Sequence, residues 1–312
     1  MTLLYTSPEF LEHKTGVHPE KPARLVKITE HLATTGLDQK CKRPDWQPVS
    51  RGRLERVHVG KYIDEVQAFA KQGGGRIEAD TVVSPKSYDV ALRAAGAVCD
   101  AVDQVVHNKA KTALCLVRPP GHHALEKSAM GFCLFNNVAI GARLAIKEFQ
   151  LDRVLVIDWD VHHGNGTQDT FWEDEQVGFL SIHRFPFYPG TGAASETGAG
   201  RGLGTTKNLP IEFGTSRKDY LTQFRNELEA FAKKINPQLV ILSAGFDSHR
   251  QDPIGSLGLE VEDFTELSQT VLGVAKNHAG GKIVSVLEGG YNIDVVPECV
   301  AVHLKELLAV GD

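Results

Sequence analysis

The stretch RVLVIDWDVHHGNG (153–166) joins an apolar run to a row of acidic and histidine residues. Its apolar half does not alternate between apolar and polar side chains, which is typical of a strand buried on both faces, as in a parallel sheet. Four other runs have the same character and predict strands of the same sheet: ALCLV (113–117), GFLSI (178–182), QLVILSA (238–244) and KIVSVLE (282–288).

Amphipathic stretches lie between these runs. In 217–235 the apolar residues from Tyr220 to Ile235 recur every three or four positions, so they share one face of a helix. Similar patterns predict further helices at 24–34, 61–71, 88–107, 136–149, 262–278 and 297–309. The alternation of strands and helices predicts an α/β fold with a single open, mainly parallel sheet flanked by helices on both faces.

The chain has 312 residues, which exceeds the usual domain length of about 150 residues, but α/β enzymes often exceed it as one unit. The Gly-rich stretch 190–208, the only long irregular segment that we expect, can be a flexible linker or a loop that shapes a site. We favour the loop, because strand-like sequence resumes on both sides. We therefore expect one catalytic domain over residues 1–312.

The composition restricts the classes of protein to consider. Hydrophobic residues make up 42% and charged residues 23%, as in soluble globular chains with a large core. A net charge of -5 without a basic cluster argues against nucleic-acid binding, and the lack of a long apolar run argues against a membrane span. Five scattered cysteines and the lack of a secretory signal predict reduced thiols and a cytoplasmic location.

Polar motifs directly follow four of the predicted strands. They are RPPGHHA (118–124), WDVHHGNG (159–166), GFDSH (245–249) and GGYN (289–292). Because the carboxyl ends of parallel strands meet at one edge of a sheet, where ligands bind in open α/β folds, we expect these motifs to form one site.

Acidic and histidine residues alternate in the motif that follows residue 157. Residues two apart at a strand end face the same side, so Asp158, Asp160 and His162 share one side, and two adjacent members can reach one divalent ion. Asp247, on another strand, is the obvious third ligand. The alternative is a hydrogen-bonded polar patch that caps the sheet, which we disfavour because of the spacing and the second strand.

The tandem histidines His122 and His123 follow two prolines on a rigid turn. Neighbouring imidazoles suit proton transfer, and Asp158 and Asn165 are available to orient them. A lone buried histidine is usually structural, but a pair facing a metal loop favours catalysis. Tyr291, after two glycines, can donate a hydrogen bond to an oxyanion, although many such turns only pack an aromatic ring.

Seven motifs in this order resemble the arginase–deacetylase superfamily, and within it the class II-like histone deacetylases and acetylpolyamine amidohydrolases of bacterial type. The resemblance covers nearly the whole chain. The motifs are HPEKPARL (18–25), RPPGHHA (118–124), GFCLFNNVAI (131–140), DWDVHHGNGTQ (158–168), PGTG (189–192), SAGFDSH (243–249) and LEGGYN (287–292).

The resemblance implies metal-assisted hydrolysis of an amide. Zinc would be bound by Asp160, His162 and Asp247. Ferrous iron remains open, because this ligand set accepts both metals. His122 and His123 would transfer protons, with His123 the favoured general base and acid, and Tyr291 would polarise the acyl carbonyl. Asp158 would orient His122, and Asn165 would orient His123.

The resemblance also implies two structural potassium sites. By position, the first would involve Asp158, Asp160, His162, Ser181 and Ile182. Backbone carbonyls of Phe171, Asp174 and Val177 would contribute to the second.

Residues Gly131, Phe132 and Tyr188 match the family's acyl-lysine tunnel, in which the two aromatic rings form the walls. Ile254 stands where polyamine-selective relatives carry a glutamate that attracts a distant ammonium, which an apolar residue cannot do. We therefore favour acyl-lysine in peptides or proteins, with small acylated amines such as acetylpolyamines as the alternative. A dimanganese ureohydrolase and an inactive acyl-binding module are disfavoured, since the histidine pair and Tyr291 are intact. Acyl length, protein partner and oligomeric state stay open.

Overall fold

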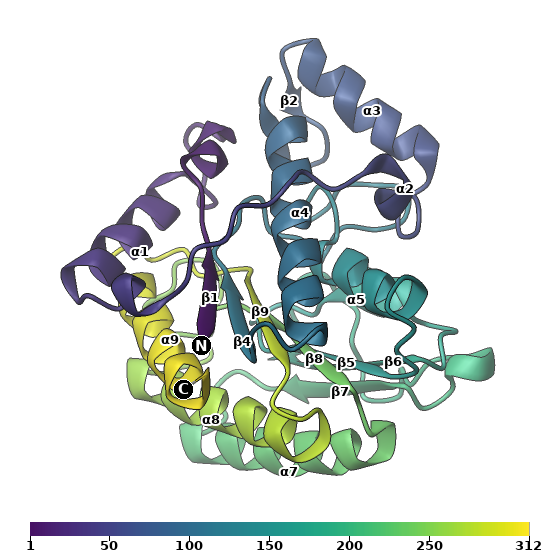
Figure 1. Cartoon of the computed structure of the whole chain (residues 1–312), viewed down its shortest axis with the longest axis vertical. Coiled ribbons are helices and arrows are strands. Elements are labelled where there is room, and N and C mark those ends of the chain that lie inside the picture. Colours follow the sequence, from purple (N-terminus) through teal and green to yellow (C-terminus); the bar gives the residue numbers. More distant parts are fainter. Residues whose placement is uncertain (312) are drawn as a thin grey trace.

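The computed structural model describes residues 1–311 and contains a seven-stranded sheet in which all neighbouring strands run parallel. The strand order is β1-β4-β9-β8-β5-β6-β7 (Figure 1). The strands are β1 (Thr2–Tyr5), β4 (Thr112–Cys115), β5 (Val154–Asp158), β6 (Val177–Arg184), β7 (Thr206–Ile211), β8 (Leu239–Ala244) and β9 (Ile283–Leu287). The predicted fold class is confirmed.

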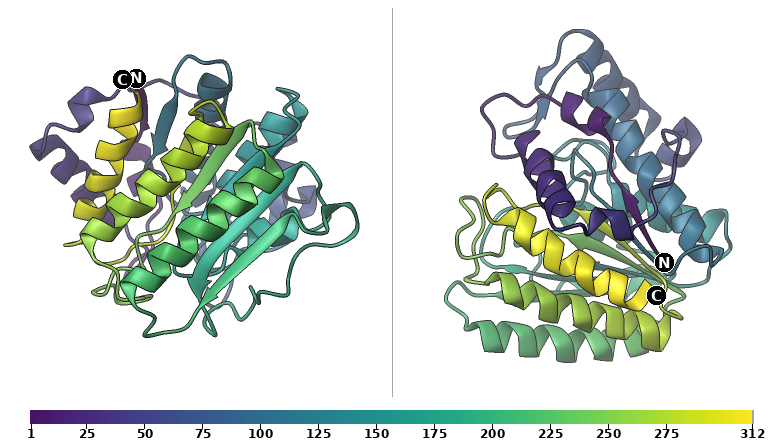
Figure 2. Two further views of the ribbon diagram at one scale, coloured as in Figure 1. Left: turned by 90° about the horizontal axis from the view of Figure 1, so that it is seen from below. Right: turned by 60° about the vertical axis from the view of Figure 1, so that its left-hand side comes forward.

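Helices cover both faces of this sheet. On one face α7 (Arg217–Ile235), α8 (Val261–His278) and α9 (Val296–Gly311) lie side by side, and on the other α4 (Ser87–Val106) packs against α5 (Asn137–Lys147) (Figures 1 and 2). Further elements are α1 (Ala23–Thr34), α2 (Arg51–Leu54), α3 (Gly60–Lys71), α6 (Asn165–Thr170) and the antiparallel pair β2 (Gly75–Arg76) and β3 (Val82–Val83). Within residues 1–311, no helix is long and apolar enough to cross a membrane.

The register of the sheet brings the ends of the central strands to one edge. Asp158, the last residue of β5, pairs with Ser181 of β6 on one side and Ser243 of β8 on the other. The next pair of strands ends level with them, because Ala244 of β8 pairs with Leu287 of β9. The polar motifs that follow these strands therefore emerge side by side.

Two edge strands and one long loop differ from the expectation. β1 and β7 were not predicted, since β1 is short and β7 (TKNLPI) contains lysine, asparagine and proline, which weaken a strand signal. Residues 206–208 of the Gly-rich stretch lie in β7. The prediction that 190–208 is the only long irregular segment is wrong, because 116–136 also lies outside helices and strands and carries the histidine pair.

Two glycines within helices, one closely packed and one not, allow a test of how tightly the helices pack. A Cβ atom at Gly96 in α4 would lie 2.1 Å from the carbonyl oxygen of Gln47, whereas one at Gly273 in α8 would have no heavy atom within 4 Å. Alanine suits a helix better than glycine by about 0.5–1 kcal/mol, so Gly273→Ala should raise the free energy of unfolding by that amount. Gly96→Ala should lower it by about 1–3 kcal/mol, because a backbone clash outweighs the propensity gain. Urea denaturation of both variants measures this, and a shift in the same direction for both would contradict it.

Candidate functional site

Three side chains from the ends of β5 and β8 form a candidate metal centre. One ligand atom each from Asp160, His162 and Asp247 lies within 4.8 Å of the others. The His162 Nδ1 atom is 3.0 Å from Asp160 Oδ1 and 3.2 Å from Asp247 Oδ2. All three side chains are buried. The residues predicted as ligands thus converge on one point at the edge of the sheet.

Two glycines leave space for the two buried carboxylates, and backbone amides hold the carboxylates by hydrogen bonds. A Cβ atom at Gly289 would lie 2.1 Å from Asp247 Oδ2, and one at Gly245 would lie 2.1 Å from Asp160 Oδ2. The Gly289 amide donates to Asp160 Oδ2 (2.8 Å), and the Val161 amide donates to Asp247 Oδ1 (2.9 Å). Among residues 1–311, Asp247 Oδ2 has no hydrogen-bond donor although it is buried. An unpaired carboxylate oxygen that faces an imidazole nitrogen fits a bound cation.

The electrostatics of this group also favour a cation. Burial and the neighbouring Asp160 raise the pKa of Asp247 to about 7. Burial disfavours the charged imidazole of His162, but the close carboxylates of Asp160 and Asp247 outweigh this and raise its pKa to about 9. Both shifts indicate a negative electrostatic potential at this point, which a bound divalent ion would neutralise in place of the protons.

The histidine pair lies beside this centre, and each ring has its own acceptor. His122 Nδ1 is 2.9 Å from Asp158 Oδ2, and His123 Nδ1 is 2.7 Å from Asn165 Oδ1. The two ring centroids are 3.9 Å apart. These are the partners that the sequence predicts. In each case Nδ1–H can donate to the oxygen and leave Nε2 free to exchange a proton.

The two histidines have opposite pKa shifts. Burial lowers the pKa of His122, but the carboxylates of Asp158 and Asp160 outweigh it and raise the value to about 10. Burial, together with the charges of His122 and His162, holds the pKa of His123 well below 6.5. These shifts favour the charged form of His122 and the neutral form of His123.

A pocket of about 250 Å³ opens onto His123 and His162. Its lining includes all four residues predicted to contact the substrate, Gly131, Phe132, Tyr188 and Ile254, and also Tyr291. The rings of Phe132 and Tyr291 meet edge to face, with centroids 5.6 Å apart. Burial raises the pKa of Tyr291 well above 10, so its hydroxyl stays protonated and can donate.

Sequence reasoning missed two residues of this pocket. Phe187 stacks on His162 with centroids 5.4 Å apart and an interplanar angle of 15°. Asp80 lines the pocket from the turn between β2 and β3 and accepts a hydrogen bond from the Gly131 amide (3.1 Å). Phe187 is the neighbour of Tyr188, and this adjacency was a usable signal. Nothing in the sequence near Asp80 marks it.

The residues predicted to bind potassium occupy two places. Asp158 is beside Ser181 in the register of β5 and β6, and the Ser181 hydroxyl is 2.9 Å from His183 Nδ1. In the second group the Asp174 amide donates to the Phe171 carbonyl (3.0 Å), and the Val177 amide donates to the Asp174 carboxylate (3.2 Å). These contacts hold both segments, and the two potassium assignments stay predictions.

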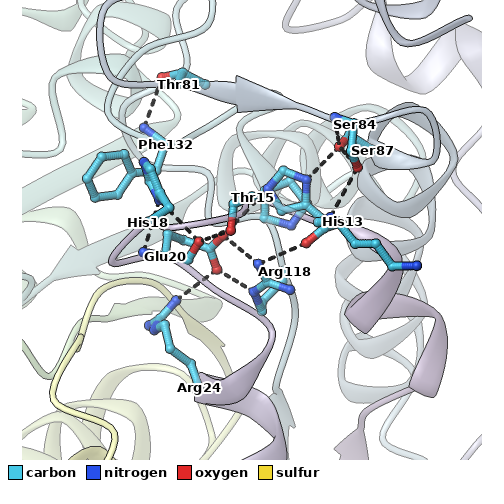
Figure 3. A network of polar contacts seen from close by, with 12 residues as sticks. His13, Thr15, His18, Glu20, Arg24, Thr81, Ser84, Ser87, Arg118 and Phe132 are labelled. Atoms are coloured by element: carbon cyan, nitrogen blue, oxygen red, sulfur yellow. Dashed lines mark hydrogen bonds and ion pairs between the residues drawn. The ribbon is translucent and has the colours of Figure 1, made fainter. Parts of the chain in front are cut away.

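A buried network of charged side chains lies next to the site, and the sequence did not predict the roles of the residues that form it. Glu20 bonds with Arg118, at 2.7 Å for one of the two contacts, and with Arg24 at 3.3 Å (Figure 3). Arg24 also donates to the carbonyls of Glu288 and Gly290, both at 2.6 Å. This network ties the N-terminal segment to the turn that carries Tyr291.

The family model of the histone deacetylase domain matches residues 18–307, and the chain belongs to the histone deacetylase family.

Solved and curated relatives agree with this assignment. The crystal structure of the HDA15 HD domain superposes with a TM-score of 0.92 at 34% identity, covering 99% of this chain and 89% of that one. A probable deacetylase of Archaeoglobus fulgidus is 36% identical over 92% of this chain and 80% of its own length. Human polyamine deacetylase HDAC10 is 38% identical over 93% of this chain and 44% of its own length. The protein is a deacetylase, a hydrolase that acts on amide bonds.

Proposed function

We propose that the protein is a zinc-dependent hydrolase that removes acetyl or other acyl groups from the ε-amine of lysine in peptides or proteins. The observation that carries the proposal is the pocket. One cavity of about 250 Å³ is lined by His162 of the buried Asp–His–Asp group, by His123 of the histidine pair and by Tyr291, whose hydroxyl stays protonated.

Asp160, His162 and Asp247 would hold the metal. Two carboxylates and one imidazole suit zinc and also accept ferrous iron, so the choice depends on availability. When bound, the ion would supply Lewis-acid polarisation of the scissile carbonyl.

The histidine pair would move the protons. His123 is neutral, and its Nδ1 is held by Asn165, so its Nε2 can take a proton from the attacking water. His122, which is charged and held by Asp158, would place a positive charge next to His123 and keep the pKa of His123 low. The proton then passes from His123 to the leaving amine, and the amide bond breaks as the carboxylate product forms.

Tyr291 would donate a hydrogen bond to the oxyanion of the tetrahedral intermediate. Tyr291 lines the same pocket as His123, and its raised pKa keeps the hydroxyl protonated, so both observations support this role.

The shape of the pocket supports acyl-lysine as the substrate. The flat rings of Phe132 and Tyr188 suit an alkyl chain, and Ile254 in the lining offers no charge for a distant ammonium. One observation favours the alternative of small acylated amines. The Asp80 carboxylate also lines the pocket and is a candidate partner for a cationic tail.

A substrate comparison tests this proposal. We expect kcat/KM on acetyl-lysine peptides to exceed that on N-acetylputrescine by at least about tenfold, and Ile254→Glu to narrow or reverse the ratio, because opposite charges attract across the pocket. Ile254→Gln is the uncharged control of similar size. A parent enzyme that prefers N-acetylputrescine would contradict the lysine assignment.

A further inference from the structure

Glu288 is a fully buried carboxylate for which the proposed chemistry has no role. It follows β9 directly and has 0% of its surface exposed. Its Oε2 atom accepts hydrogen bonds from the amides of Gly121 (2.7 Å) and His122 (3.2 Å). Its Oε1 atom accepts one from the Ser243 hydroxyl (3.2 Å). The side chain therefore joins the histidine turn to the ends of β8 and β9.

Hydrogen bonding alone does not require a carboxylate here. A glutamine of the same shape could accept both amides with its oxygen and donate to the Ser243 hydroxyl with its nitrogen, so all three contacts would remain satisfied. Burying a charge is unfavourable unless it is compensated. Burial, aided by the nearby Asp158 and Asp160, raises the pKa of Glu288 to about 7.

The contrast with Glu20 shows what compensates a buried carboxylate in this protein. Glu20 is equally buried, but its oxygens meet the guanidinium groups of Arg118 and Arg24. Arg24 reaches Glu288 only through the backbone carbonyl. The group that most favours the charged form of Glu288 is His122, whose backbone it also holds.

We propose that Glu288 is a positioning residue for the histidine pair. Its carboxylate fixes the turn 119–123 against β9, and its charge stabilises the positive charge on the pair while the amide is cleaved. The inference rests on the proposed proton-transfer role of the pair. It does not depend on which acylated amine is the substrate, because Glu288 acts on the histidine turn of the protein and not on the substrate.

Glu288→Gln tests this inference, since the substitution keeps the shape and the hydrogen bonds and removes only the charge. We expect kcat to fall at least about tenfold with KM within about twofold, because the charge acts on the transition state and not on the bound substrate. The amount of bound metal should equal that of the parent. The melting temperature should not fall, because the substitution removes a buried charge whose desolvation is unfavourable.

The measurements are made at pH 8 on acetyl-lysine peptide and on N-acetylputrescine, with Glu298→Gln, at an exposed position in the first turn of α9, as the matched control. A variant with parental kcat overturns the inference. So does a loss of kcat that comes with lost metal or a melting temperature lowered by several degrees, because either result indicates a purely structural role. A parent inactive on both substrates contradicts the proposed function instead, and the inference falls with it.

Discussion

Asp247→Asn is expected to abolish metal binding and to reduce deacetylation below detection. The substitution keeps an oxygen for the Val161 amide but replaces Oδ2, the unpaired acceptor that faces His162, with a group that cannot bind a cation. Loss of residues that only support a metal ligand reduces affinity by about 10–100-fold, and loss of a ligand should exceed that. Metal content by mass spectrometry and melting curves under zinc titration measure the effect.

The metal-free proteins should behave differently from the loaded ones. Without a cation, the parent buries two facing carboxylates, so the metal-free Asp247→Asn variant should melt no lower than the metal-free parent. Only the parent should gain stability when zinc is added. Asp294→Asn, at an exposed position, is the control. A variant that still binds one zinc per chain with parental affinity would contradict the assignment of the three ligands.

Tyr291→Phe is expected to lower kcat by about 10²–10³-fold, as the loss of other oxyanion donors does. Within residues 1–311 the Tyr291 hydroxyl makes no hydrogen bond, so its removal breaks none. The ring would keep its contact with Phe132 and with the Arg24 guanidinium, whose Cζ atom is 4.8 Å from the ring centroid. Melting temperature, metal content and KM should therefore change little.

Tyr88→Phe, which alters a half-buried ring packed on Phe135, is the matched control for this substitution. A Tyr291→Phe variant within a few-fold of the parent would remove the residue from the catalytic set. A loss of activity that accompanies a loss of folded protein would also contradict the prediction, because the expected fall in kcat occurs in a fully folded variant.

The central part of the fold could be predicted because its signals are local. The runs at β5, β8 and β9 do not alternate between apolar and polar side chains, which is typical of a parallel sheet covered on both faces. β7 was missed because an edge strand tolerates lysine, asparagine and proline, so its sequence does not differ enough from a loop. The single domain over residues 1–312 stays a prediction.

The candidate site could be predicted as far as its residues follow strand ends. Asp158 and Asn165 were proposed as partners of the histidine pair, and both lie within hydrogen-bond distance of it. Glu288 and Glu20 could not be assigned, because their partners are far away in sequence and the chemistry of a glutamate in a motif does not tell which backbone amides or arginines it will meet. The catalytic and metal-binding roles proposed for the residues of the site are tested by the experiments described above.

The N-terminal segment matters for where a shortened version of the chain can begin. The family match starts at residue 18, but β1 pairs with β4, and Arg118 donates to the carbonyls of Phe10 (2.9 Å) and His13 (3.2 Å). A recombinant fragment cut at the homology boundary would expose the edge of β4 and leave a buried guanidinium without two of its acceptors. Expression boundaries for this protein should therefore follow the sheet rather than the alignment.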